Sequence, residues 1–148
     1  MLITLLTVVV LAVMAAVVAT ISGDLPAQVV THWGASGAAD GFTSRDDLWT
    51  VLAIPVVLGG VLLPVAFLGD RLPAGMHWLT GLPVGTSLGV GAIVVGSLLP
   101  QRGLTDAATA PFPGWLIPVA VALGIVATVL AARLSPTPSL HTTTRAAP

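Results

Sequence analysis

Four long stretches without Asp, Glu, Lys or Arg constrain the fold of this chain more than any other feature. They cover residues 2–21, 48–68, 76–99 and 115–132. As a helix, the first stretch rises about 30 Å, the thickness of the hydrocarbon core of a bilayer. A backbone in lipid must satisfy its own hydrogen bonds, so we expect each stretch to be helical. The sequence predicts an all-α integral membrane protein with four transmembrane helices.

The scarcity of charge supports this class. Charged residues make up 7% of the chain and the mean hydropathy is +1.02, whereas a soluble domain carries roughly 25% charged residues. The net charge of −1 and the lack of a polybasic run exclude nucleic acid as a partner. The absence of Cys excludes disulfides and thiolate chemistry. All basic residues are Arg and all acidic residues are Asp, which is typical of a high-GC bacterial genome.

The predicted organisation is a single membrane domain followed by a tail. The domain spans residues 1–134, with helices at about 2–21, 45–68, 76–99 and 115–133, and a polar loop over 22–44. The first stretch lacks the basic start and cleavage site of a signal peptide, so we expect it to be retained. Residues 135–148 have no apolar periodicity and are predicted to be a disordered cytoplasmic tail.

Arg counting predicts the orientation. Four spans place both termini on one side, and the side with more Arg faces the cytoplasm. With the termini inside, the cytoplasmic face carries Arg71, Arg133 and Arg145, and the outer face carries Arg45 and Arg102. We therefore expect a multi-pass protein of the bacterial plasma membrane with both termini cytoplasmic, whose first partner is the lipid bilayer.

Local signals mark helix starts and bends. Ser44 precedes Asp47 by three residues, and Thr43 precedes Asp46 by the same spacing, so either hydroxyl is a candidate N-cap for the second helix. Prolines inside the apolar stretches are expected to bend those helices. They are Pro55, Pro64 and Pro83.

The third stretch has a face of small residues. Gly81, Gly85 and Gly89 recur every four residues, a spacing that lets helix backbones approach closely in lipid. This face is interpreted as a packing surface between helices of the chain. The alternatives are a homo-oligomer or a seam for a larger membrane partner.

The apolar stretches contain no ionisable group at depth. Proton relays and ion-coupled transporters need such groups within the membrane. A hydrolase needs a nucleophile beside a base, and the only His near acids is His32. We therefore expect no enzyme activity.

The loop over residues 22–44 holds most of the polar chemistry. Residues 28–33 alternate imperfectly between polar and apolar, as in a short strand, and residues 42–45 are a candidate return strand. Gly34, Gly37 and Gly41 supply positions that adopt positive φ and turn the chain. The predicted structure is a short, Gly-rich, hairpin-like extracytoplasmic cap between the first two helices.

His32, Asp40 and Asp24 form the one candidate ligand set in this loop. His and carboxylates bind metals, but spacings of eight and sixteen residues match no metal motif. We therefore predict neither a metal nor a cofactor. His32 is instead expected to hydrogen-bond Asp40 or a loop carbonyl and so order the turn.

The stretch "LPAQVVTHWGASGAADGFTSR" resembles the hallmark of a membrane family, domain of unknown function 1648. The resemblance rests on Leu25, Pro26, His32, Trp33, Gly37, Asp40, Ser44 and Arg45. Val30 stands where the family usually has Pro, and Arg45 replaces the usual Lys, which keeps the charge. The motif residues Pro26, His32, Trp33, Gly37, Asp40 and Arg45 are the candidate site.

The family's best-known members are Sdp-type immunity proteins, which have more spans than this chain. The resemblance implies a non-enzymatic protein that senses, or gives immunity to, an extracytoplasmic peptide toxin or envelope stress. Its partner would be a peptide ligand. The alternative is an accessory or structural subunit of a larger membrane complex, with a membrane-protein partner.

Overall fold

The structure is a computed structural model that describes residues 1–135. Its α-helices are α1 (Leu2–Ile21), α2 (Leu48–Phe67), α3 (Leu82–Leu98) and α4 (Leu116–Leu134). With the 3₁₀ turns that extend them, four helices are long and apolar enough to cross a membrane. The predicted mostly helical class with four such helices is confirmed. Of the tail predicted over 135–148, residues 136–148 lie outside the described part of the chain.

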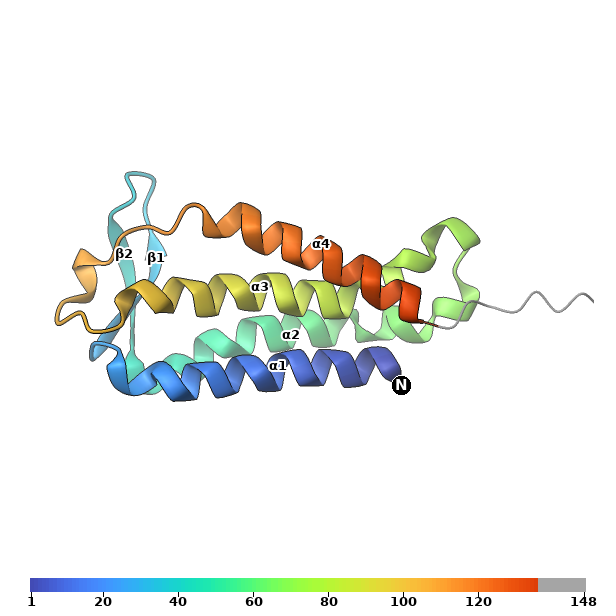
Figure 1. Cartoon of the computed structure of the whole chain (residues 1–148), viewed down its shortest axis with the longest axis horizontal. Coiled ribbons are helices and arrows are strands. Elements are labelled where there is room, and N and C mark those ends of the chain that lie inside the picture. The colour runs from blue at the N-terminus through green and yellow to red at the C-terminus, as the bar shows by residue number, and fades with distance from the viewer. Residues whose placement is uncertain (136–148) are drawn as a thin grey trace, which may run out of the picture.

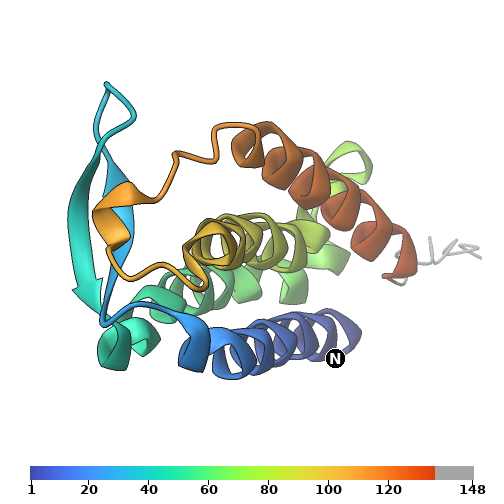
Figure 2. The same ribbon diagram turned by 60° about the vertical axis from the view of Figure 1, so that its left-hand side comes forward.

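Helix α3 is the centre of the bundle. It packs against α4, α2 and α1, and in Figure 1 it lies between α4 and the other two helices. A two-stranded hairpin and the loop between α3 and α4 lie at one end of the bundle. The N-terminus, the segment 68–81 and the last turn of α4 lie at the other end. Figure 2 shows the hairpin standing across its end of the helices.

The glycine face of α3 packs against α4. A Cβ on Gly81 would meet the backbone of Thr128, and one on Gly85 would meet the Thr128 hydroxyl and the Gly124 carbonyl. A Cβ on Gly89 would lie 3.1 Å from the carbonyl oxygen of Ala120. The close approach of α4 therefore depends on the absence of side chains at Gly81, which ends the 3₁₀ helix before α3, and at Gly85 and Gly89 on α3. Within the chain, this face is occupied by α4.

The third helix begins later than its apolar stretch. Residues Ala74–Gly81 form a 3₁₀ helix, and the α-helix starts at Leu82. The Leu82 N–H donates to the Leu79 carbonyl in the 3₁₀ pattern, and Pro83 has no N–H to close an α-helical bond there. Pro83 therefore lies in the first turn of α3, where a missing donor is tolerated, and not within the helix as expected.

The second helix starts as a capped 3₁₀ turn. The Ser44 hydroxyl accepts the N–H of Asp46 at 3.3 Å, and the turn Arg45–Asp47 leads into α2 at Leu48. Of the two candidate N-caps, Ser44 is the one with a capping bond. The carboxylates of Asp46 and Asp47 follow it, where the partial positive charge of a helix N-terminus favours them.

Candidate functional site

The hairpin between α1 and α2 contains most of the motif residues. Its strands β1 (Gln28–Trp33) and β2 (Ala39–Ser44) are antiparallel. In the turn, the Gly34 N–H donates to the Ala38 carbonyl at 2.8 Å, and Gly37 has a φ of 79°. Gly37 therefore adopts the left-handed conformation that favours glycine. Gly34 and Gly41 were expected to share this conformation, but neither has a positive φ.

Both faces of β1 are covered, which explains its imperfect alternation. Consecutive strand residues point to opposite faces, and here Val29 and Val30 are both fully buried. Val29 packs with Ile21, Leu48 and Leu98 at the ends of three helices. Val30 packs instead under the loop between α3 and α4, with the residues Ala107 and Ala110. The hairpin is thus held between the bundle and a loop far away in the sequence.

Gln101 attaches the free edge of β1 to the end of α3. Its Oε1 accepts the N–H of Val30 at 2.7 Å, and its Nε2 donates to the Val30 carbonyl at 2.9 Å and to the Ser97 carbonyl at 2.9 Å. The side chain therefore acts as one residue of a third strand. Gln101 is fully buried, and its amide satisfies two buried backbone groups that would otherwise lack partners.

A second connection joins the same loop to the end of α1. The Arg102 guanidinium donates two hydrogen bonds to one carboxylate oxygen of Asp24, at 2.5 and 3.1 Å. The Gly103 N–H donates to the Asp24 carbonyl at 2.8 Å. Asp24 was a candidate metal ligand with His32 and Asp40, but here it is paired with an arginine. Within residues 1–135, no group of three or more His, Cys, Asp or Glu is placed to hold a metal.

His32 and Asp40 contact each other at the outer end of the hairpin. The Nδ1 of His32 lies 2.5 Å from a carboxylate oxygen of Asp40, and both side chains are more than half exposed. Of the two partners expected for His32, the structure shows Asp40. Because the pair is exposed, it contributes at most about 1 kcal/mol to stability. Its polar atoms remain accessible to a ligand.

Two glycines make room for this pair. A Cβ on Gly41 would lie 2.7 Å from the His32 Cβ, and a Cβ on Gly34 would lie 2.7 Å from the Asp40 carboxylate. Gly41 is paired with His32 across a strand irregularity on either side of the histidine. These glycines therefore serve close packing and not a left-handed turn.

Trp33 faces the interior of the hairpin end. Its Nε1–H donates to the Ala110 carbonyl at 3.2 Å, and its ring lies 5.9 Å from the ring of Phe112 at a tilt of 52°. Both partners belong to the loop between α3 and α4. Trp33, next to the exposed His32, thus fixes the hairpin against this loop.

Pro26 and Arg45 fix the base of the hairpin. Pro26 is buried just before β1. The Arg45 N–H donates to the Ala27 carbonyl at 2.9 Å, and its guanidinium donates to the Leu25 carbonyl at 3.1 Å. The motif residues therefore lie together on one hairpin, and most of them have a contact that explains their position.

A cavity of about 480 Å³ opens beside the motif strand. It is bounded by β1, α2, α3 and the start of α4, and its walls are mostly apolar. The residues that line it include Trp33, Ile54, Ile93, Ser97, Phe112 and Ile117. His32 also contributes to the lining, so the exposed polar pair is at the edge of an apolar space.

The family model described as "Domain of unknown function (DUF1648)" matches residues 3–59. Over these residues the chain is similar to that family. The match covers α1, the hairpin and the first part of α2, which is less than half of the chain. No curated protein and no solved structure matches the chain.

The segment that matches the family model is in contact with residues outside the match. Gln101 and Phe112 contact the hairpin, and Arg102 contacts Asp24 at the end of α1. All three belong to the loop after α3. Sequence reasoning did not identify them as partners of the motif. The only signal was a polar "QR" pair directly after an apolar stretch, which is also usual at a membrane interface.

Proposed function

We propose that this chain is a non-enzymatic bacterial membrane protein that senses, or gives immunity to, an extracytoplasmic membrane-active peptide. The hairpin faces the outside of the plasma membrane in this proposal, and both termini are cytoplasmic. The supporting observation is the cavity beside β1. Its lining combines motif residues with residues of three helices that are long and apolar enough to cross a membrane. The DUF1648 match is consistent with such a membrane protein.

The chemistry of the cavity favours an amphipathic ligand. Its walls accept an apolar side chain, whereas His32 in its lining and the Asp40 paired with it are exposed and can hydrogen-bond a polar backbone or a charged group. A peptide at the membrane surface presents both kinds of group. A soluble polar metabolite would leave the apolar walls without a partner.

The His32–Asp40 pair provides the direct test of this proposal. We expect the double replacement His32→Ala and Asp40→Ala to weaken peptide binding about tenfold, since a hydrogen bond to a charged group contributes about 1.5–3 kcal/mol. Binding is measured as retention of synthetic amphipathic peptides by the purified chain, and protection as survival of expressing cells. The melting temperature should stay nearly constant because the pair is exposed.

A second variant tests the cavity itself. Ile54→Trp fills the space from α2, whereas Val57→Trp adds the same bulk on an exposed part of α2 that does not line the cavity. We expect only Ile54→Trp to weaken peptide retention. Full retention by both the double variant and Ile54→Trp, in chains that reach the membrane, would refute the proposal.

The rival function is an accessory subunit of a larger membrane complex. Its sequence support was the glycine face of α3, which packs against α4 within the chain. Purification in a mild detergent separates the two functions. A stoichiometric membrane-protein partner favours the subunit, and a chain that is isolated alone and retains peptide favours sensing or immunity.

The orientation has its own prediction. The chain has no Cys, so Ser36→Cys introduces a single thiol at an exposed position in the hairpin turn. We expect a membrane-impermeant maleimide to label it on intact cells, because this turn faces outward in the proposal. Gly75→Cys, which is exposed with nothing within 4 Å of the added Cβ, should be labelled only after permeabilisation. The reverse pattern would place the termini outside.

A further inference from the structure

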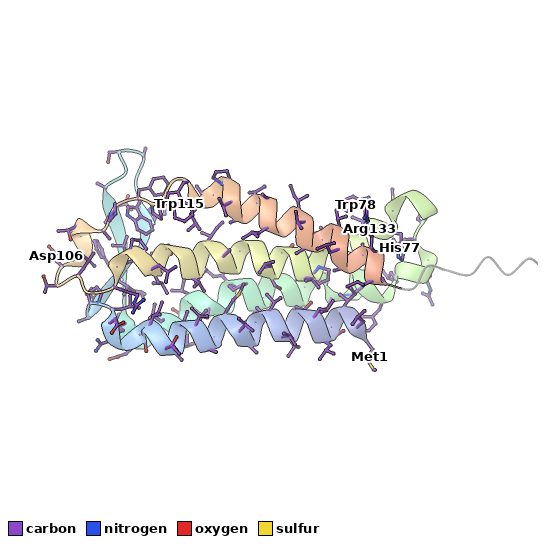
Figure 3. All side chains as sticks on the ribbon, in the orientation of Figure 1. Met1, His77, Trp78, Asp106, Trp115 and Arg133 are labelled. Atoms are coloured by element: carbon purple, nitrogen blue, oxygen red, sulfur yellow. The ribbon has the colours of Figure 1, made fainter. Side chains whose placement is uncertain are left out.

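The end of the bundle that carries the N-terminus and the last turn of α4 has a pocket with a positive charge. It has a volume of about 360 Å³ and is lined by His77, Trp78, Val129, Ala132 and Arg133. Figure 3 shows His77, Trp78 and Arg133 gathered at this end. Among the described residues that line the pocket, Arg133 carries a positive charge and none carries a negative one. The charge therefore favours an anionic ligand.

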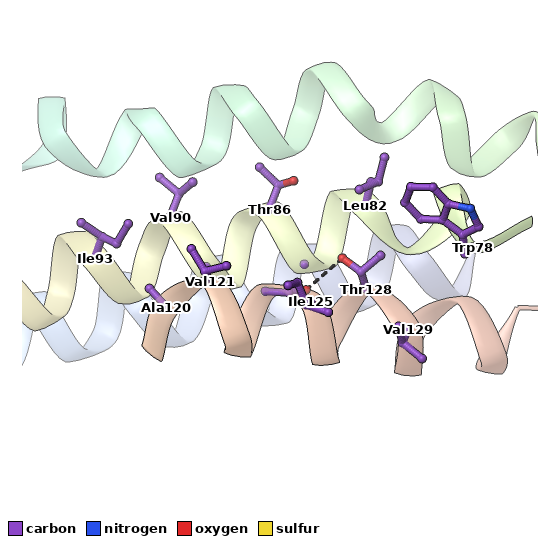
Figure 4. A pocket seen from close by; sticks show the side chains of 13 residues that line it. Trp78, Leu82, Thr86, Val90, Ile93, Ala120, Val121, Ile125, Thr128 and Val129 are labelled. Atoms are coloured by element: carbon purple, nitrogen blue, oxygen red, sulfur yellow. Dashed lines mark hydrogen bonds between the residues drawn. The ribbon is translucent and has the colours of Figure 1, made fainter. Parts of the chain in front are cut away.

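An apolar groove between α3 and α4 continues from this pocket. Trp78 and Val129 line both spaces, and the groove has a volume of about 380 Å³. Figure 4 shows Leu82, Thr86, Val90 and Ile93 in a row along α3. The Thr128 hydroxyl, which also lines the groove, already donates to the Gly124 carbonyl at 2.9 Å. The groove therefore offers an apolar wall with few unpaired polar groups.

The length of the groove matches one leaflet of a bilayer. Leu82 and Ile93 bound most of it along α3, and their separation corresponds to about 16 Å at 1.5 Å per residue. Half of the hydrocarbon core is about 15 Å. A single acyl chain of one leaflet fits this length, whereas a partner transmembrane helix needs about twice as much.

The polar groups lie where a lipid headgroup would be. Arg133 is exposed in the last turn of α4, and Trp at the end of an apolar span is typical of the membrane interface. Both ring nitrogens of His77 are shielded from solvent and have no hydrogen-bond partner among the side chains that the structure describes. A phosphate beside Arg133 would receive a charge-assisted hydrogen bond, which is stronger than a neutral one.

We propose that the pocket and the groove together bind one anionic glycerophospholipid of the leaflet next to the N-terminus and the last turn of α4. Its phosphate lies at Arg133 beside Trp78, and one acyl chain lies along α3 between Leu82 and Ile93. This site is at the opposite end of the bundle from the hairpin, so it is independent of peptide binding.

Native mass spectrometry of the full chain in mild detergent tests this site. Dioleoyl-phosphatidylglycerol and dioleoyl-phosphatidylcholine share their acyl chains and differ in net charge. We expect the first to be retained about fivefold more tightly, because one Arg near a membrane surface provides about that much attraction for an anionic lipid. Arg133→Gln should remove this preference. Arg71→Gln, an exposed residue at the same end that lines neither space, should keep it.

The groove is tested with a second pair of variants. Thr86→Phe adds bulk in the groove, and Val61→Phe adds it on an exposed part of α2 outside the groove. Loss of both lipids in Thr86→Phe alone supports an acyl chain in the groove. Equal retention of the two lipids, equal losses with Arg71→Gln and Arg133→Gln, or displacement of the lipid by inorganic phosphate alone would overturn the proposal. A co-purified membrane protein in place of lipid would also overturn it.

Discussion

Replacing Gln101 by Met is expected to destabilise the chain by about 3 kcal/mol. Met has a similar size but removes all three hydrogen bonds of the Gln101 amide. The N–H and C=O of the fully buried Val30 are left without partners, and each such group costs about 1–3 kcal/mol. Thermal unfolding of the purified chain in mild detergent measures the loss. Hydrogen exchange at the Val30 amide, which should become faster, shows where it occurs.

The neighbouring residue provides a matched control. Arg102→Gln breaks the ion pair with Asp24, whose side chains are about half exposed, so the expected loss is within about 1 kcal/mol. Both residues join the loop after α3 to the N-terminal half, but only Gln101 satisfies buried groups. Equal destabilisation by the two variants, or unchanged exchange at Val30 in Gln101→Met, would show that Gln101 does not fix the hairpin.

Features that depend on local sequence could be predicted. The apolar stretches predicted four helices, and α1 coincides with its predicted range. The alternation over residues 28–33 corresponds to β1. His32 and Asp40 are eight residues apart across a tight turn, so their contact follows from the turn itself. In each case, the interacting groups are close together along the chain.

Features that depend on distant pairing could not be predicted. Val30 and Gln101 are 71 residues apart, and Asp24 and Arg102 are 78 residues apart. The arrangement of the helices determines which loop folds over the hairpin. Local patterns in a single sequence do not reveal that arrangement. Trp33 shows the consequence, because its partners lie in the loop after α3.

Gly34 and Gly41 show a different limit. The sequence offered Gly34, Gly37 and Gly41 as positions for positive φ, and of these three only Gly37 has it. The other two are small because side chains of Asp40 and His32 lie against them. Conformational freedom and lack of volume are separate properties of glycine, and only the second depends on neighbours in space.

The contact between α3 and α4 is the second place where one substitution should have a large effect. We expect Gly85→Val to destabilise the chain by about 3 kcal/mol, the upper range for an overpacked core. A Cβ at this position meets both the Thr128 hydroxyl and the Gly124 carbonyl. The Thr128 side chain can move to another rotamer, but the Gly124 carbonyl belongs to the backbone of α4 and cannot. The two helices must therefore separate. In lipid, helix association relies on this close packing, since burial from water no longer drives it.

Substitutions at two other glycines should destabilise the chain less than Gly85→Val. Gly89→Ala places its Cβ 3.1 Å from the Ala120 carbonyl oxygen, which a small shift relieves, so we expect a loss of about 1 kcal/mol. Gly60→Val on α2, with nothing within 4 Å of the added Cβ, should be nearly neutral. Unfolding in mild detergent should rank the variants in this order. If Gly60→Val costs as much as Gly85→Val, the loss would not come from the contact of residue 85 with α4, since valine has a better helix propensity than glycine. The contact between α3 and α4 would then not depend on the glycine face.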